Sequence, residues 1–96
     1  MYGVVGKMRC VPGRREELIA QLTQSGSMPG CLQYIVARDR ADDDAIWVTE
    51  IWESAAAHLA SLELSEVKEA IAVGRPLIAG FEMRATTEPV GGIGLP

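Results

Sequence analysis

The clearest pattern in the chain is a predicted strand that carries apolar side chains on both of its faces. Alternate residues of an extended strand point to opposite sides, so Ile46, Val48 and Trp52 share one face. Trp47 and Ile51 share the other face, whereas a half-buried strand alternates apolar and polar residues. Both faces therefore need cover, and 96 residues supply helices enough for only one. We expect the second face to meet another copy of the protein.

Hydrophobic periodicity predicts four strands and three helical segments in all. Alternation favours strands, and apolar residues that recur every three or four positions favour helices. The predicted strands are residues 2–11, 31–38, 46–52 and 81–87, and the predicted helices are residues 14–24, 55–62 and 65–78. Ser54 and Ser65 are expected N-caps, residues 25–27 are expected to end the first helix, and Pro76 is expected to kink or end the last one.

The element order β-α-β-β-α-α-β indicates an α+β fold of the ferredoxin-like, split βαβ kind. Such a βαββαβ fold has a four-stranded antiparallel sheet of order 4-1-3-2 with its helices on one face. Residues 1–88 are predicted to form this single domain, and residues 89–96 are a Gly- and Pro-rich tail without a regular pattern. The first two strands are not neighbours in this order, so no disulfide is expected between Cys10 and Cys31.

Charge and composition exclude several classes of function. The net charge is −4 and the basic residues form no stripe, so nucleic acid is not an expected partner. No apolar run approaches the ~20 residues that cross a bilayer, and the N-terminus lacks a signal-peptide pattern, so we expect a cytoplasmic protein with no membrane partner. The acidic residues 42–44 are interpreted as a solvated loop. One histidine and two cysteines supply no zinc ligand set, so neither a metal nor a cofactor is expected.

Several short motifs occur in an order that is typical of a known family. They are Pro12-Gly13, Met28-Pro29-Gly30-Cys31, Trp52-Glu53-Ser54, Ala57-His58-Leu59-Ala60-Ser61 and Leu77-Ile78-Ala79-Gly80-Phe81-Glu82. Through them the chain resembles the antibiotic biosynthesis monooxygenase (ABM) domain family, which has the dimeric α/β-barrel fold. The resemblance covers nearly the whole chain. It implies a homodimer whose two sheets face each other, with a pocket in each subunit between sheet and helices.

The resemblance leaves several activities open. Some members of the family oxidise quinols or polyketide anthrones with molecular oxygen and no metal or flavin, others degrade haem, and many have no known activity. The haem-degrading branch uses an Asn, a Trp and an axial His, and the matching positions here hold Gly6, Ser61 and Ile71. Haem degradation is therefore not expected. The anthrone-oxidising branch places an Asn in its pocket, and this sequence contains no asparagine.

His58 is the candidate catalytic residue. It is the only histidine, and histidine is the residue that ordinarily exchanges protons near neutral pH. Oxidation of a phenol or quinol by oxygen starts more readily from the deprotonated substrate, so a positioned base would accelerate it. His58 also matches a histidine often seen at this place in the family. The alternative is a structural histidine at the boundary between helix and sheet.

Three aromatic residues are candidates for binding a planar substrate. Trp47 and Trp52 lie on opposite faces of their strand, so one should line the pocket on the helix side and the other the dimer interface. The sequence leaves open which tryptophan takes which place. An indole ring in the pocket would hold the substrate by offset stacking. Tyr34 has a hydroxyl that can donate to a substrate oxygen, and the alternative is a tyrosine with its hydroxyl satisfied in the core.

A buried carboxylate is expected on the same strand. Glu50 shares a face with Val48 and Trp52, and a carboxylate among apolar side chains needs a partner. We expect that partner to be an arginine from another strand, Arg38 or Arg84. A structural ion pair of this kind is the expected role of Glu50, rather than catalysis.

Two functional hypotheses follow. In the first, the protein is a homodimeric, cofactor-independent monooxygenase that oxidises a planar hydroxylated aromatic, quinol or anthrone-like, with molecular oxygen. In the alternative it is a non-catalytic small-molecule-binding or dimerisation module of the same fold, because a fold does not fix a function. An oxygenase should need the base His58, whereas a binding module should tolerate its loss. In either case we expect residues 89–96 to become ordered by packing on the partner subunit.

Overall fold

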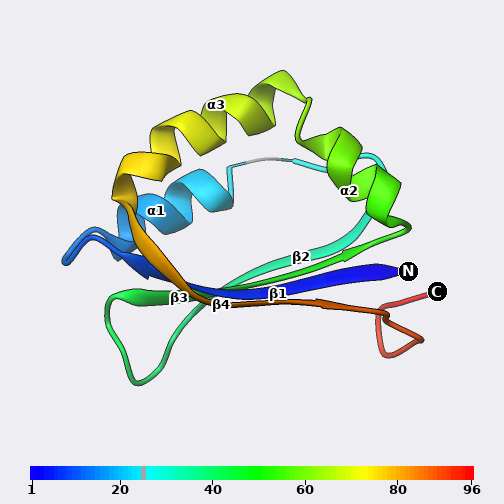
Figure 1. Ribbon diagram of the computed structural model, residues 1–96, viewed down its shortest axis with the longest axis horizontal. Coiled ribbons are helices and arrows are strands. Elements are labelled where there is room, and N and C mark those ends of the chain that lie inside the picture. Colours follow the sequence, from blue (N-terminus) through cyan, green and yellow to red (C-terminus); the bar gives the residue numbers. More distant parts are fainter. Residues whose placement is uncertain (25) are drawn as a thin grey trace.

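The computed structural model describes residues 1–24 and 26–96, and it has one antiparallel sheet with helices over a single face (Figure 1). The strands are β1 (Tyr2–Cys10), β2 (Cys31–Arg38), β3 (Ala45–Trp52) and β4 (Ile78–Thr87). The helices are α1 (Arg15–Leu22), α2 (Ala55–Ser61) and α3 (Ser65–Gly74), which runs on into the short 3₁₀ helix η1 (Arg75–Leu77). The strand order β2-β3-β1-β4 is the predicted order 4-1-3-2 read from the other edge. The predicted ferredoxin-like α+β fold is confirmed.

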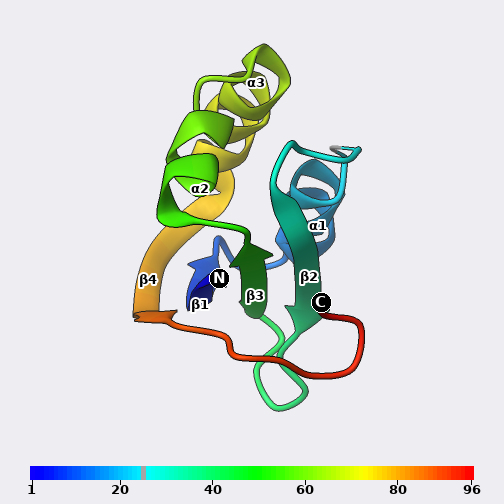
Figure 2. The ribbon, with the colours of Figure 1, turned by 90° about the vertical axis from the view of Figure 1, so that its right-hand side faces the viewer.

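The helices stand over the sheet in two groups. Figure 2 shows α1 above the β2 side of the sheet, and α2 and α3 above the side of β1 and β4. The opposite face of the sheet, called the open face below, has no helix over it. Among the described residues, no helix is both long and apolar enough to cross a membrane.

The ends of several elements differ from the predicted ones. Helix α1 ends at Leu22 instead of residue 24, and the Thr23 hydroxyl donates to the carbonyl of Ile19 at 2.8 Å. The predicted stop that follows begins at Ser25, which lies outside the described residues. Strand β4 begins at Ile78 rather than at residue 81, because η1 ends just before it and Ile78 pairs with Cys10 of β1.

The two serine caps have different outcomes. The Ser54 hydroxyl accepts the Ala57 backbone N–H at 3.1 Å and caps α2, as predicted. The predicted cap at Ser65 is wrong, because Leu64 is the N-cap of α3 and makes no side-chain capping bond, while Ser65 is the first helical residue. Pro76 lies in η1, directly after α3 ends, which fits its inability to donate a helical hydrogen bond.

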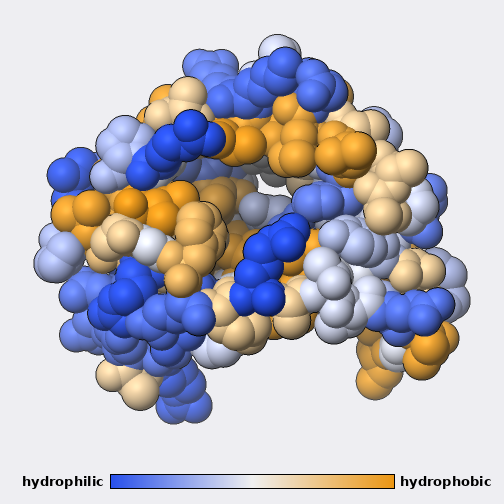
Figure 3. Space-filling model, in the orientation of Figure 1, coloured by the Kyte–Doolittle hydropathy of each residue, from blue (hydrophilic) through white to orange (hydrophobic). Residues whose placement is uncertain are grey.

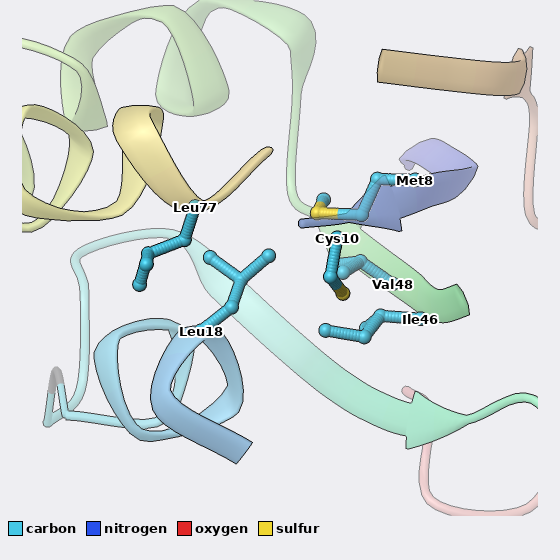
Figure 4. Packing of buried hydrophobic residues seen from close by; sticks show 6 residues of the cluster. All are labelled: Met8, Cys10, Leu18, Ile46, Val48 and Leu77. Atoms are coloured by element: carbon cyan, nitrogen blue, oxygen red, sulfur yellow. The ribbon is translucent and has the colours of Figure 1, made fainter. Parts of the chain in front are cut away.

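The hydrophobic core occupies one end of the helix-covered face. It consists of Met8, Cys10, Leu18, Ile46, Val48 and Leu77 (Figure 4). Leu18 and Ile46 have no exposed surface, and burial of such a side chain contributes about 1.5–3 kcal/mol. The cluster therefore fixes α1 and η1 against β1 and β3. Cys10 and Cys31 are both free thiols, as expected from their separated strands.

The open face carries a row of small and apolar side chains across its centre. Strand pairing aligns Ala85 of β4, Val5 of β1, Thr49 of β3 and Ile35 of β2. Ile35 keeps 49% of its surface exposed. The loop between β2 and β3 and the C-terminal tail project beyond this face at its two ends (Figure 1). The helices therefore cover only one of the two faces of β3 that the sequence predicted to need cover.

Candidate active site

A cavity of about 850 Å³ lies between the sheet and the helices. Most of its wall is apolar, including Met8, Leu22, Val36, Val67, Ile71 and Phe81. Figure 3 shows the molecule hollowed between α3 and the sheet, with apolar side chains of the helix along this hollow. A volume of this size falls in the range of small-molecule sites, which combine apolar walls with a few placed polar groups.

The polar groups of the cavity centre on Glu50. Its position in β3 follows from the pleat of the strand, which points Glu50 to the same side as Trp52 and the core residue Val48. The Trp52 indole N–H donates to Glu50 Oε1 at 3.1 Å. The Glu50 side chain is only 17% exposed. The expected arginine partner is wrong, because the groups beside this carboxylate are Trp52 and His58.

His58 enters the cavity from α2. The Ser54 cap sets where the helix begins and so places His58 one turn into it, over the sheet. Its Nε2 lies 3.7 Å from Glu50 Oε1, which is an ion-pair distance and longer than a hydrogen bond. The imidazole ring stands edge-on to the Trp52 ring at 5.3 Å between centroids and lies 5.6 Å from the Tyr2 ring. The structure thus surrounds His58 with two aromatic rings and one carboxylate.

Tyr34 lines the cavity from β2, where it is the direct cross-strand partner of Glu50. Burial, together with the nearby negative charge of Glu50, raises the pKa of the Tyr34 phenol to about 12. Tyr34 therefore keeps its proton across the physiological range. Its hydroxyl is available as a hydrogen-bond donor rather than as a base.

Trp47 lies apart from these groups, on the open face. Its indole N–H donates to Asp39 Oδ2 at 2.8 Å, and the Lys7 ammonium lies 5.6 Å from the centre of its ring. The sequence placed the two tryptophans on opposite faces without saying which one meets the pocket. In the structure, Trp52 lines the cavity and Trp47 lies on the open face. Of the four predicted site residues, it brings together His58, Trp52 and Tyr34.

Metal-binding side chains are not gathered in this cavity. Within residues 1–24 and 26–96, no three side chains of His, Cys, Asp or Glu lie grouped as they would around a metal ion. Ser61 and Ile71, which the resemblance set against the Trp and His of haem-degrading family members, both line the cavity. Neither side chain offers an imidazole to a haem iron.

Comparison with known proteins places this geometry in a family. The sequence model of the family described as antibiotic biosynthesis monooxygenase matches residues 1–73. The chain belongs to the antibiotic biosynthesis monooxygenase family. The match runs from β1 to the last turn of α3 and therefore includes Tyr34, Glu50, Trp52 and His58.

Solved structures agree with this membership. One from Chloroflexus aurantiacus J-10-fl, described as a candidate antibiotic biosynthesis monooxygenase, is 55% identical, covers 99% of this chain and 98% of that chain, and has a TM-score of 0.96. Candidates of the same description from Deinococcus radiodurans and Caulobacter crescentus CB15 are 22% and 23% identical, cover 97% and 94% of this chain and 96% and 90% of theirs, and both have a TM-score of 0.75. At those identities they show the fold alone. No curated protein matches the chain.

One residue of this ABM site was missed by the sequence reasoning. Tyr2 packs against His58, and it pairs with Trp52 in the sheet. The signal for it was the alternation in β1, since Tyr2 lies on the same side as Val4 and Met8. That alternation becomes informative only when the register with β3 is known, because register decides which residues become neighbours across two strands.

Proposed function

We propose that this ABM protein is a cofactor-independent monooxygenase that oxidises a planar hydroxylated aromatic, quinol or anthrone-like, with molecular oxygen. Family membership supports the monooxygenase type of activity. The observation that carries the proposal is the gathering of His58, Trp52 and Tyr34 around one largely apolar cavity. Such a site offers an aromatic side chain for stacking against planar rings, together with a proton acceptor and a proton donor on its lining.

In the proposed reaction the substrate supplies the electrons. Tyr34, which keeps its proton, donates a hydrogen bond to a substrate oxygen, and His58 accepts the proton that the substrate loses. The resulting anion is easier to oxidise and transfers its electrons to oxygen. For an anthrone-like substrate, a C–O bond forms to give a hydroperoxide. Loss of water then leaves a carbonyl at that carbon, so one oxygen atom enters the product and the other leaves in water.

The test of this proposal is oxygen uptake without added cofactor, measured against a panel of quinols and anthrones. With an active substrate, His58→Gln should lower turnover about a hundredfold, because general-base catalysis is worth at least that much. The glutamine keeps a similar shape but takes no proton near neutral pH. Circular dichroism and binding of a non-oxidisable analogue should show that fold and binding are retained.

The alternative predicts a different result in the same assay. If His58→Gln keeps turnover within a factor of about three, the effect is too small for lost general-base catalysis and His58 is structural. If no quinol or anthrone is oxidised while aromatic ligands still bind, the protein is a binding module of the ABM fold.

We also propose that the working unit is a homodimer in which the open faces of two sheets meet. The support is the exposed apolar surface on that side: Ile35 and Met83 are 49% and 38% exposed. In the tail, Val90 is 93% exposed and Ile93 is fully exposed. A second subunit would cover these side chains, and the tail would gain the apolar contacts that it lacks in one chain.

A further inference from the structure

We propose that Glu50 is a positioning residue for His58. In this proposal its carboxylate holds the imidazole in the orientation needed for proton transfer. It also stabilises the imidazolium that forms when His58 accepts the proton of the substrate. The inference rests on the proposed function, since it takes His58 as the proton acceptor, and it assigns to Glu50 a role other than that of a structural ion pair.

The geometry around the carboxylate supports this role. Glu50 Oε1 accepts the Trp52 indole N–H at 3.1 Å and lies 3.7 Å from His58 Nε2. Trp52 is 1% exposed and stands edge-on to the imidazole. A single buried indole therefore fixes the carboxylate by a hydrogen bond and confines the imidazole by packing. This is the arrangement expected where one side chain orients another.

The charge of Glu50 is the feature that packing does not explain. A carboxylate in an apolar cavity costs free energy unless it is compensated, and a neutral amide would serve Trp52 equally well as an acceptor. In the described part of the chain, His58 is the only basic side chain within 4.0 Å of Glu50. Arg75 of η1 also lines the cavity but forms no ion pair with Glu50 within 4.0 Å. The carboxylate is therefore placed to stabilise the imidazole when that ring gains a proton.

The other ionisable groups facing Glu50 do not supply that counter-charge. Tyr34 lies opposite on β2, and Cys31 is near it on the same strand. Tyr2 of β1 packs on the far side of the imidazole. All three are neutral in their protonated forms, and the negative charge of Glu50 acts with burial to keep Tyr34 and Cys31 in those forms. Glu50 thus helps to keep Tyr34 protonated, as a hydrogen-bond donor to the substrate requires.

The proton transfer can be followed in charges. A carboxylate beside Nε2 favours the tautomer with its N–H on that nitrogen, so the other ring nitrogen is the acceptor. The substrate O–H bond breaks, the proton binds that nitrogen, and the electron pair stays on the substrate oxygen. In this proposal the substrate oxygen lies beyond the imidazole, so the carboxylate is closer to the imidazolium, 3.7 Å from Nε2, than to the new phenolate. Attraction therefore outweighs repulsion, and Glu50 favours the transfer.

A chromophoric phenol tests this directly. We suggest 4-nitrophenol, because its visible absorption distinguishes the bound phenol from the bound phenolate. Spectra of the probe with wild type, Glu50→Gln and Glu53→Gln should be compared at one near-neutral pH. Glu50→Gln keeps an acceptor for Trp52 but removes the charge. Glu53, which is exposed at the end of the same strand, provides the matched control.

We expect the ratio of bound phenolate to bound phenol to fall about three- to tenfold in Glu50→Gln, as befits the loss of one partly screened neighbouring charge. Glu53→Gln should match wild type. Turnover of an active substrate should fall in Glu50→Gln with little change in KM, and Glu50→Asp should recover part of it. An unchanged phenolate ratio in a folded Glu50→Gln protein that binds the probe would overturn the inference. If Glu50→Gln does not fold, Glu50→Asp takes its place in the comparison. The ratio of bound phenolate to bound phenol should then fall by a smaller factor, and an unchanged ratio would contradict the inference.

These readouts separate the inference from the proposed function. If wild type oxidises a quinol and Glu50→Gln does so equally well with the same phenolate ratio, the function stands and the role of Glu50 is wrong. If wild type oxidises nothing in the panel but the ratio still depends on Glu50, the proposed oxygenase activity is wrong. The proton-accepting pair then belongs to a binding site.

Discussion

The two tryptophans of β3 make the same contact on opposite faces of one sheet, with different results. Trp52 donates its indole N–H to Glu50 at 3.1 Å inside the cavity. Trp47 donates to Asp39 at 2.8 Å on the open face. The difference lies in what else each carboxylate meets. Glu50 has an imidazole beside it, whereas Asp39 also accepts two backbone N–H groups, at 2.8 and 2.9 Å, and lies 3.7 Å from the Lys7 ammonium.

The comparison separates a carboxylate with fixed partners on the open face from one beside an imidazole in the cavity. Asp39 belongs to a network in which every charge has a partner: Lys7 and Arg9 both bind Glu82, and Arg9 also binds Asp42. Satisfied charges of this kind hold a loop and a strand edge in place, and they have no proton to exchange near neutrality. Glu50 lacks such a fixed counter-charge, so its environment changes whenever His58 gains or loses a proton. This contrast supports the proposals that catalysis takes place on the helix-covered face and subunit contact on the open face.

The largest effect should come from emptying the core beneath the helices. Leu18→Ala should lower the free energy of unfolding by about 3 kcal/mol, since Leu18 is fully buried and its loss leaves a cavity. Ile35→Ala, on the open face, should cost less than about 1 kcal/mol in the isolated chain. Urea unfolding of both variants at low protein concentration measures the difference. Equal costs would mean that the open face is packed as tightly as the core.

The second largest effect tests the proposal that the open face is the subunit interface. Ile35→Glu places a charge in the centre of that face, and the dimer dissociation constant should rise at least tenfold, because an unpaired charge in an interface costs more than about 1.4 kcal/mol. Leu59→Glu, at an exposed apolar position of α2, is the matched control and should leave the constant unchanged. Sedimentation equilibrium gives both values. A wild type that is monomeric at micromolar concentration would refute the dimer.

Exchanging each tryptophan for phenylalanine tests the comparison itself. Trp52→Phe leaves a buried carboxylate without its donor and should lower stability by about 1–3 kcal/mol and reduce turnover. Trp47→Phe should cost less and leave turnover unchanged, because Asp39 keeps its backbone donors and Lys7. Thermal unfolding and oxygen uptake provide the two readouts. Equal loss of turnover in both variants would show that the open face takes part in the chemistry.

The fold was predictable from sequence because its signals are local. Alternation, helical spacing and the Ser54 cap each act within a few residues, and together they give the element order that selects the sheet topology. The failures were also local. The cap at Ser65 was assigned from residue type alone, although a serine one position inside a helix contributes no capping bond. The start of β4 was missed because Ile78 fits a helical stripe equally well and joins the sheet only through its pairing with Cys10.

The sequence predicted residues that line the site, but not which of them contact one another. His58, Trp52 and Tyr34 were found as residue types with suitable chemistry, and the structure does bring them to one cavity. The partner of Glu50 was assigned to an arginine because charge pairing is the default for a buried carboxylate. Its neighbours are Trp52, the next residue on the same face of β3, and His58 of α2. Sequence alone does not show that Arg38 turns outward to pair with Glu16.

The smallest effect is an acid dependence on the open face. The Trp47 indole N–H, two backbone N–H groups and the Lys7 charge lower the pKa of Asp39 from 3.8 to about 2. A carboxyl group with a lower pKa in the folded state stabilises the fold above its unfolded pKa, and this contribution is lost as the pH falls through the folded value. The loss should therefore occur between about pH 4 and about pH 2, the window set by these two values.

Asp39→Asn removes the titrating group and leaves one accepting oxygen in place of two, so it keeps either the Trp47 bond or the two backbone bonds. Its melting temperature should lie below that of wild type near neutral pH. The gap should close as the pH falls from about 4 to about 2, because the unfolded wild-type chain then binds a proton at Asp39 that the folded protein binds only near pH 2. Asp43→Asn, at an exposed position of the same loop, is the control and should follow wild type throughout. Melting curves of the three proteins between about pH 2 and about pH 7 measure the gap. A gap that stays constant over this range would mean that Asp39 stabilises the fold through hydrogen bonds alone. The charge of Asp39 would then contribute nothing to stability, and the contrast drawn above between the charge network of the open face and Glu50 would be wrong.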